Sequence, residues 1–198
     1  MAILDMTTAR RMASELPFGE RLLRLESNPQ LGEEAIKSPF RYVSPSVRGS
    51  DFLSNCYGTA TYVLGLEDDI LAYFVESRAD VLRTHPEFNY TVFPDRLAEH
   101  PGYVGYKHME EFLEKGGRMS GAVREPLPGD LVMFSARPSL SRFDHSGVFV
   151  GVLNGCNVMF HQEDKGMPFR LGTVEDYAAR LEETRQHVMP SFYRKIES

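Results

Sequence analysis

The feature that most constrains this chain is a pair of apolar stretches separated by Asn154 and Gly155. His145 to Val152 and Cys156 to His161 are rich in valine and aromatic residues, which favour β-strands. Asn-Gly between two such stretches is a strong hairpin signal, because both residues accept a positive φ. The sequence therefore predicts an antiparallel hairpin over residues 145–161.

The register of this hairpin decides which side chains share a face. A two-residue turn would pair Leu153 with Cys156 and direct His145 and His161 to opposite faces, since side chains alternate along a strand. A three-residue loop would pair Val152 with Cys156 and gather the valines on one wholly apolar face. That apolar face favours the three-residue loop. We therefore expect both histidines on the other face, within reach of a shared partner.

Two glycines, Gly147 and Gly151, lie on the histidine face of the predicted hairpin. Glycine allows another element to approach a strand closely, and we expect a helix that begins at Cys56 to do so. A thiol at a helix N-terminus has a lowered pKa, and a nearby histidine can take its proton. Cys56, His145 and His161 have the residue types of a nucleophile, a base and a group that orients the base.

The remaining pattern places helices before strands. An N-terminal helical extension is expected over residues 1–38. The helices and strands predicted after it are expected to form one further domain. Consecutive strands after a run of helices predict an α+β fold with an antiparallel sheet. The expected helices are 7–16, 20–26, 56–64 (closed by Gly65), 68–83, 107–115 and 173–184, and the further strands are 131–135 and 188–196.

Composition narrows the classes of function. The chain has 198 residues and a formal net charge of −6, and no cluster of Lys and Arg suggests a nucleic-acid partner. No apolar stretch approaches the roughly 18 residues that cross a bilayer, so no integral membrane segment is expected. No secretory signal is recognised either. We expect a cytoplasmic protein, and export without a signal peptide stays open.

Four sequence blocks resemble those of the NlpC-type peptidoglycan endopeptidases, a family of papain-like cysteine hydrolases. The two strand blocks are the most specific part of the resemblance, which spans about residues 39–196. The blocks are Tyr42 followed by Asn55-Cys56-Tyr57-Gly58, then Pro128-Gly129-Asp130-Leu131-Val132-Met133-Phe134, then His145-Ser146-Gly147-Val148-Phe149-Val150-Gly151, and finally His161.

This resemblance implies a papain-like NlpC-type domain over residues 39–198, in which an antiparallel sheet packs against the helix that bears the nucleophile. Residues 66–105 would be an insertion, because the interval from the first block to the third is longer than the family's. The resemblance assigns the nucleophile to Cys56, the general base to His145 and the orienting role to His161. It places Tyr42, Asn55 and Tyr57 in the oxyanion and substrate region.

Two positions depart from the family pattern. Asn55 replaces an aspartate and Tyr57 replaces a small serine, and both line the family's substrate groove. We expect a cysteine hydrolase that cleaves a peptide-like amide through an acyl-enzyme, with a muropeptide as one candidate substrate. A non-catalytic peptide- or ligand-binding domain on the same fold, or an acyltransferase, are the alternatives. No cofactor is expected, and no metal, because Cys56, His145 and His161 lack a fourth ligand.

Overall fold

A computed structural model describes residues 4–28, 35–36, 52–53, 55–66, 69–70, 73, 106–117, 119–136, 143–163, 167–183 and 188–196. Tyr42, most of the predicted insertion and most of the predicted helix over 68–83 lie outside these residues. The boundary expected near residue 38 also lies outside them.

The described chain has the α+β organisation that the sequence predicts, with a five-stranded antiparallel sheet in the order β6-β5-β4-β3-β7. Two short strands pair separately. The helices are α1 (Met6–Ser14), α2 (Gly19–Ser27), α3 (Cys56–Leu64), α6 (Tyr106–Lys115) and α7 (Val174–Glu182); the strands are β1 (Ala35–Ile36), β2 (Phe52–Leu53), β3 (Leu131–Ala136), β4 (Phe143–Leu153), β5 (Cys156–Gln162), β6 (Phe169–Thr173) and β7 (Val188–Tyr193).

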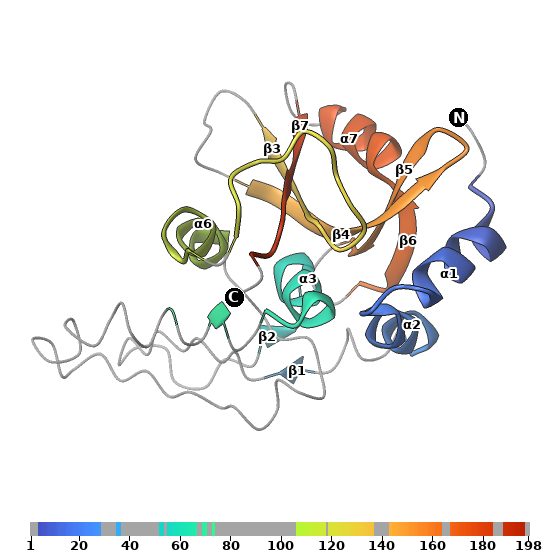
Figure 1. Cartoon of the computed structure of the whole chain (residues 1–198), viewed down its shortest axis with the longest axis horizontal. Coiled ribbons are helices and arrows are strands. Elements are labelled where there is room, and N and C mark those ends of the chain that lie inside the picture. Colours follow the sequence, from blue (N-terminus) through green and yellow to red (C-terminus); the bar gives the residue numbers. More distant parts are fainter. Residues whose placement is uncertain are drawn as a thin grey trace, which may run out of the picture.

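Helices cover both faces of the large sheet, with α3 on one side and α7 on the other (Figure 1). On the face that we call the α3 face, Val148, Val150 and Phe160 pack into the core that contains α3. On the opposite face, the α7 face, Phe149 and Met159 pack into a second core that contains α7. Because helices cover each face and keep water away from it, the side chains on both faces are mainly apolar.

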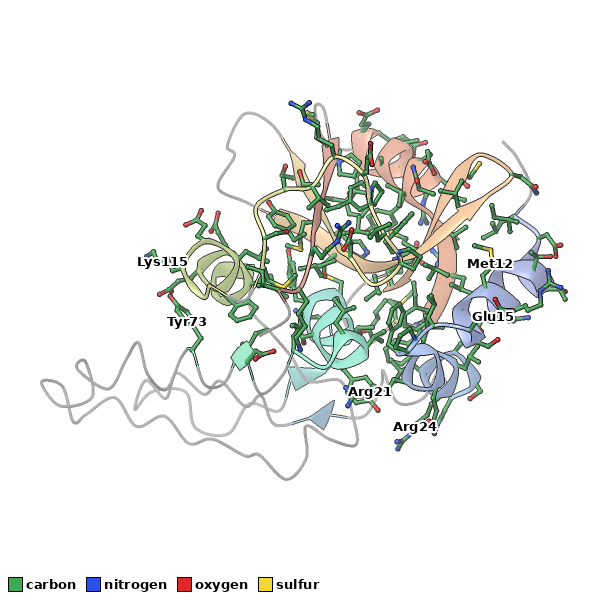
Figure 2. The ribbon with its side chains drawn as sticks, viewed as in Figure 1. Met12, Glu15, Arg21, Arg24, Tyr73 and Lys115 are labelled. Atoms are coloured by element: carbon green, nitrogen blue, oxygen red, sulfur yellow. The ribbon has the colours of Figure 1, made fainter. Side chains whose placement is uncertain are left out.

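Helix α3 has the bounds that its end signals predict. The Asn55 side chain accepts a hydrogen bond of 3.0 Å from the Gly58 backbone N–H, and Gly65 ends the helix with φ 62°. Several β-branched residues weaken the intrinsic helix propensity, so packing must hold this helix. Figure 2 shows Arg21 reaching from α2 toward α3, where its Nη1 donates to the Tyr62 carbonyl at 2.7 Å.

The turn of the β4–β5 hairpin differs from the expected one. Leu153 pairs with Cys156, so the connection has two residues, and the predicted three-residue loop is wrong. Asn154 and Gly155 both have positive φ, at 53° and 80°. This is the geometry of a type I′ turn, whose twist matches that of the two strands.

A β-bulge at Val150 then restores the expected faces. The register shifts between Phe149 and Gly151, so β4 has one extra residue. Beyond the bulge, Val148 pairs with Phe160, which is the pairing that the three-residue loop would have given. His145 and His161 consequently share one face, as predicted. On the other side of the bulge Val152 is 58% exposed rather than part of the apolar face.

The turn before β3 is held by a buried carboxylate. Both oxygens of Asp130 accept hydrogen bonds of 2.9 Å from Arg194, which follows β7, and one also accepts from the Leu127 N–H. Asp130 is buried, and its hydrogen bond raises the pKa of Arg194. The Pro-Gly-Asp block therefore joins two strand ends through a charge-assisted pair. Among the described residues, no helix combines the length and apolarity needed to span a bilayer.

Candidate functional site

The structure brings His145 and His161 into direct contact. The Nε2 atom of His145 lies 2.9 Å from the Nδ1 atom of His161, and both side chains are buried. One of these nitrogens donates and the other accepts, so the hydrogen bond fixes the tautomers of the two rings together. Strands β4 and β5 position the pair, because the register of Val148 with Phe160 places His145 and His161 diagonally on one face of adjacent strands.

Aromatic rings enclose the histidine pair on the α7 face. The Tyr177 ring, from α7, stacks on His145 with ring centroids 4.0 Å apart and meets His161 edge-on at 5.0 Å. Phe134, from β3, lies 5.8 Å from His145 and 5.1 Å from Tyr177. These rings exclude water from most of the imidazole surface and hold the orientation of both side chains.

Burial keeps both imidazoles uncharged. It lowers the pKa of His145 well below the usual value, and the neighbouring His161, Arg180 and Arg170 lower it further. Burial and the same two arginines lower the pKa of His161 to about 3. Both rings are therefore neutral near pH 7, and they interact with other groups through hydrogen bonds rather than through charge.

A cavity of about 480 Å³ lies between β6 and α7 and is lined in part by His161. The Nε2 atom of His161 makes no hydrogen bond with any described residue. Gly172 keeps this atom accessible, because a Cβ at that position would lie 3.4 Å from Nε2. The other lining residues are Arg170, Leu171, Thr173, Asp176, Ala179, Arg180 and Glu183.

A carboxylate joins the two walls of this cavity. Glu163, which follows β5, forms ion pairs with both Arg170 of β6 and Arg180 of α7. The Arg180 guanidinium also lies over the Tyr177 ring, 5.1 Å from its centroid. Sequence reasoning did not single out these charged residues, because ion pairs between separate elements have no fixed spacing. No signal in the sequence would have found them.

Cys56 lies on the opposite side of the sheet from the histidines. Its side chain belongs to the core of the α3 face, whereas His145 and His161 contact Tyr177 on the α7 face. The expectation that the helix beginning at Cys56 covers the histidine face is therefore wrong, because α7 covers it. Gly147 makes room there for the His161 and Met159 side chains rather than for a helix.

The other residues expected near the nucleophile serve α3 itself. Asn55 caps the helix through Gly58, and Tyr57 is buried in the core around Cys56. Both predicted positions are thus described, and neither contacts the histidine pair in any interaction seen here between described residues. Tyr42, the remaining predicted residue of that region, lies outside the described residues.

Polar groups of the α3 face come from the residues that directly follow the two histidines. The Oε1 atom of Gln162 accepts a hydrogen bond of 2.9 Å from Thr59 of α3, and its Nε2 donates to the Met167 carbonyl at 2.8 Å. Ser146 is fully buried, and its Oγ has no hydrogen-bond partner among the residues that the structure describes. Strand alternation places both side chains opposite the imidazoles. That alternation could have identified them in the sequence.

Within the described ranges, no three His, Cys, Asp or Glu side chains are arranged to hold a metal ion. Comparison with protein families, with curated proteins and with solved structures gives no match for this chain. The geometry of the two faces is therefore the basis for any functional argument.

Proposed function

We propose that this protein is a ligand-binding domain whose ligand occupies the cavity beside His161. The observation that carries this proposal is a buried imidazole whose Nε2 atom faces that cavity without a hydrogen bond to a described residue. Because this atom opens on the cavity, a bound ligand can take the place of water as its hydrogen-bond partner. The cavity volume, about 480 Å³, lies in the range of small-molecule sites.

In this proposal His145 positions His161 rather than contacting the ligand. Its Nε2 atom is bonded to His161 Nδ1. If His145 donates, His161 presents an Nε2–H donor to the ligand, and if His161 donates, its Nε2 becomes an acceptor. Tyr177, stacked on His145, holds the pair in place. The neutral state of both rings favours a ligand group such as an amide or a hydroxyl at Nε2.

Filling the cavity tests this proposal. Gly172 has ordinary strand backbone, so Gly172→Val places a side chain against Nε2 without backbone strain. We expect at least one of three probes, acetamide, succinate or glycylglycine, to shift the ¹⁵N resonances of His161, and the valine variant to lose that shift. Gly121→Val is the matched control, because a Cβ there meets nothing within 4 Å. The proposal is contradicted if no probe shifts the His161 resonances of the parent protein, or if a probe shifts them equally in the parent protein and in Gly172→Val.

A second candidate is the cysteine hydrolase that the sequence blocks imply, on a papain-like NlpC-type fold. Cys56 supports it as the first residue of α3, where a helix N-terminus favours a thiolate. The thiolate would form a thioester with the acyl group of a peptide-like amide. The amine would leave with a proton from water, and the resulting hydroxide would attack the thioester, release the carboxylic acid and restore the thiolate. His145 and His161 face away from Cys56, so this chemistry would have to proceed without them.

Thiol labelling separates the two candidates. We expect iodoacetamide to label Cys56 with an ordinary thiol profile from pH 5 to 9, and His145→Ala to change the rate by less than about twofold. Cys56→Ala identifies the signal, since Cys156 is the other cysteine. Fast labelling below pH 7 favours the hydrolase. If that fast rate also requires His145, the separation of thiol and imidazole is contradicted.

A further inference from the structure

We infer that the cavity beside His161 binds a zwitterionic amino acid or short peptide, and that Glu163 occupies the carboxylate position when the ligand is absent. The inference rests on the proposed binding function and names the ligand class. It is carried by the arrangement of charge around the cavity, which has a cationic pair bridged by an internal carboxylate and two further acids on one helix.

The cationic pair suits a carboxylate. Arg170 and Arg180 come from opposite walls, and the Glu163 carboxylate bonds to both. Guanidinium groups bind carboxylates through paired hydrogen bonds, so Glu163 demonstrates the ligand chemistry that this position accepts. The three side chains are 42%, 47% and 29% exposed. Ion pairs this exposed are weak, which allows a ligand carboxylate to replace Glu163.

The acidic side chains suit an ammonium group. Asp176 and Glu183 line the same cavity, and neither forms an ion pair with a described residue. Asp176 lies four residues before Arg180 on α7, and Glu183, the C-cap residue, lies three residues after it, so all three side chains follow one stripe of the helix. A simple anion would meet these two carboxylates, and a simple cation would meet the two guanidinium groups. A zwitterion matches both.

The middle of the cavity suits a peptide group. His161 is neutral, and its Nε2 atom, which bonds to none of the described residues, can hydrogen-bond with an amide from whichever tautomer the pair adopts. Thr173, nearby in the lining, already accepts a hydrogen bond from the Asp176 N–H as the cap of α7. That hydrogen bond orients the first turn of α7, from which Asp176 reaches the cavity.

The experiment is calorimetric titration with four probes of different charge: glycylglycine, succinate, 1,4-diaminobutane and acetamide. We expect glycylglycine to bind the whole protein most tightly. Glu163→Gln should strengthen its binding about tenfold, because the internal competitor loses its charge. Asp176→Asn should weaken glycylglycine binding about threefold and leave succinate unchanged or tighter. Glu182→Gln removes an exposed acid from the same helix and should change each affinity by less than about twofold.

Each other outcome has a definite meaning. Tighter binding of succinate or of 1,4-diaminobutane than of glycylglycine overturns the zwitterion assignment. Weaker binding of glycylglycine to Glu163→Gln overturns the role of Glu163 as a stand-in for the ligand. Binding of acetamide alone, still lost in Gly172→Val, rejects the ligand class and keeps the proposed function. No binding by any probe rejects both.

Discussion

The two faces of the five-stranded sheet divide between them the groups that catalysis would need together. The α3 face holds the thiol of Cys56, with Thr59, Ser146 and Gln162 as its polar groups. The α7 face holds both imidazoles and the charged cavity. The first face is a core with a few buried polar side chains, and the second has a hydrogen-bonded imidazole pair beside an opening.

The difference teaches that residue types in the right order along a chain do not yet form a site. A thiol and an imidazole on opposite faces of one sheet are separated by its backbone, and neither can take a proton from the other directly. The α7 face, in contrast, combines burial, two imidazoles whose tautomers are coupled by a hydrogen bond, and an accessible nitrogen. The following predictions test this division, beginning with the largest expected effect.

The α7 face should make the protein sensitive to acid. His161 has a folded pKa of about 3 against an unfolded value near 6.5, so protons bind preferentially to the unfolded chain as the pH falls through that range. Stability is therefore complete above pH 6.5 and decreases below it. We expect His161 to account for a loss of about 2 kcal/mol between pH 7 and pH 5, with His145 acting in the same direction.

Urea unfolding at several pH values measures this loss. The control is His161→Gln, which keeps a hydrogen-bonding side chain at that position and removes the titration. Its stability should fall less steeply with acid than that of the parent protein, by about 2 kcal/mol over the same interval. Parallel pH profiles for the two proteins would show that His161 is not buried in the neutral form.

On the α3 face, Thr59→Val should destabilise the protein. Valine has nearly the shape of threonine but cannot donate to Gln162 Oε1, which would lose this hydrogen bond in a buried place. We expect a loss of about 1 to 2 kcal/mol in the free energy of unfolding. The His145 and His161 resonances should not move, since they belong to the other face. Thr61→Val is the matched control, because the Thr61 hydroxyl donates within its own helix, to the Gly58 carbonyl.

Ser146→Ala should have the smallest effect and the opposite sign. The serine hydroxyl is buried and has no partner in the described part of the chain, so its removal relieves a desolvation penalty and leaves only a small void. We expect a stabilisation of about 0.5 to 1 kcal/mol by urea unfolding. A marked destabilisation would mean that the hydroxyl has a hydrogen bond in solution, and the contrast with Thr59 would then disappear.

Local signals in the sequence predict most of the described elements. Helix α3 begins and ends where Asn55 and Gly65 indicate, and the cap at Thr173 begins α7. Strand β6 was not expected, because Phe169–Thr173 has few residues and lies directly before a helix. The hairpin turn was also missed, since the apolar pattern contains no sign that β4 includes a bulge.

The candidate site was predictable only in part. Strand alternation predicts that His145 and His161 share one face of the hairpin, because the register is set by residues close to each other in the sequence. Which helix covers their face is decided by packing between distant segments, and both faces of the sheet are apolar. The same is true of Glu163, whose two arginine partners come from different elements. Such contacts have no periodicity along the chain that a reader of the sequence could detect.

The extra residue at Val150 separates the tip of the β4–β5 hairpin from its base. Because the phase of the side chains changes there, the tip can adopt a tight connection while the base follows a different alternation. A designer who removed Val150 and lengthened the connection by one residue would replace the bulge and its two-residue turn with a regular strand and a three-residue loop. The imidazole pair would keep its direction, and loop length at this end of the molecule could be varied without rebuilding the interior.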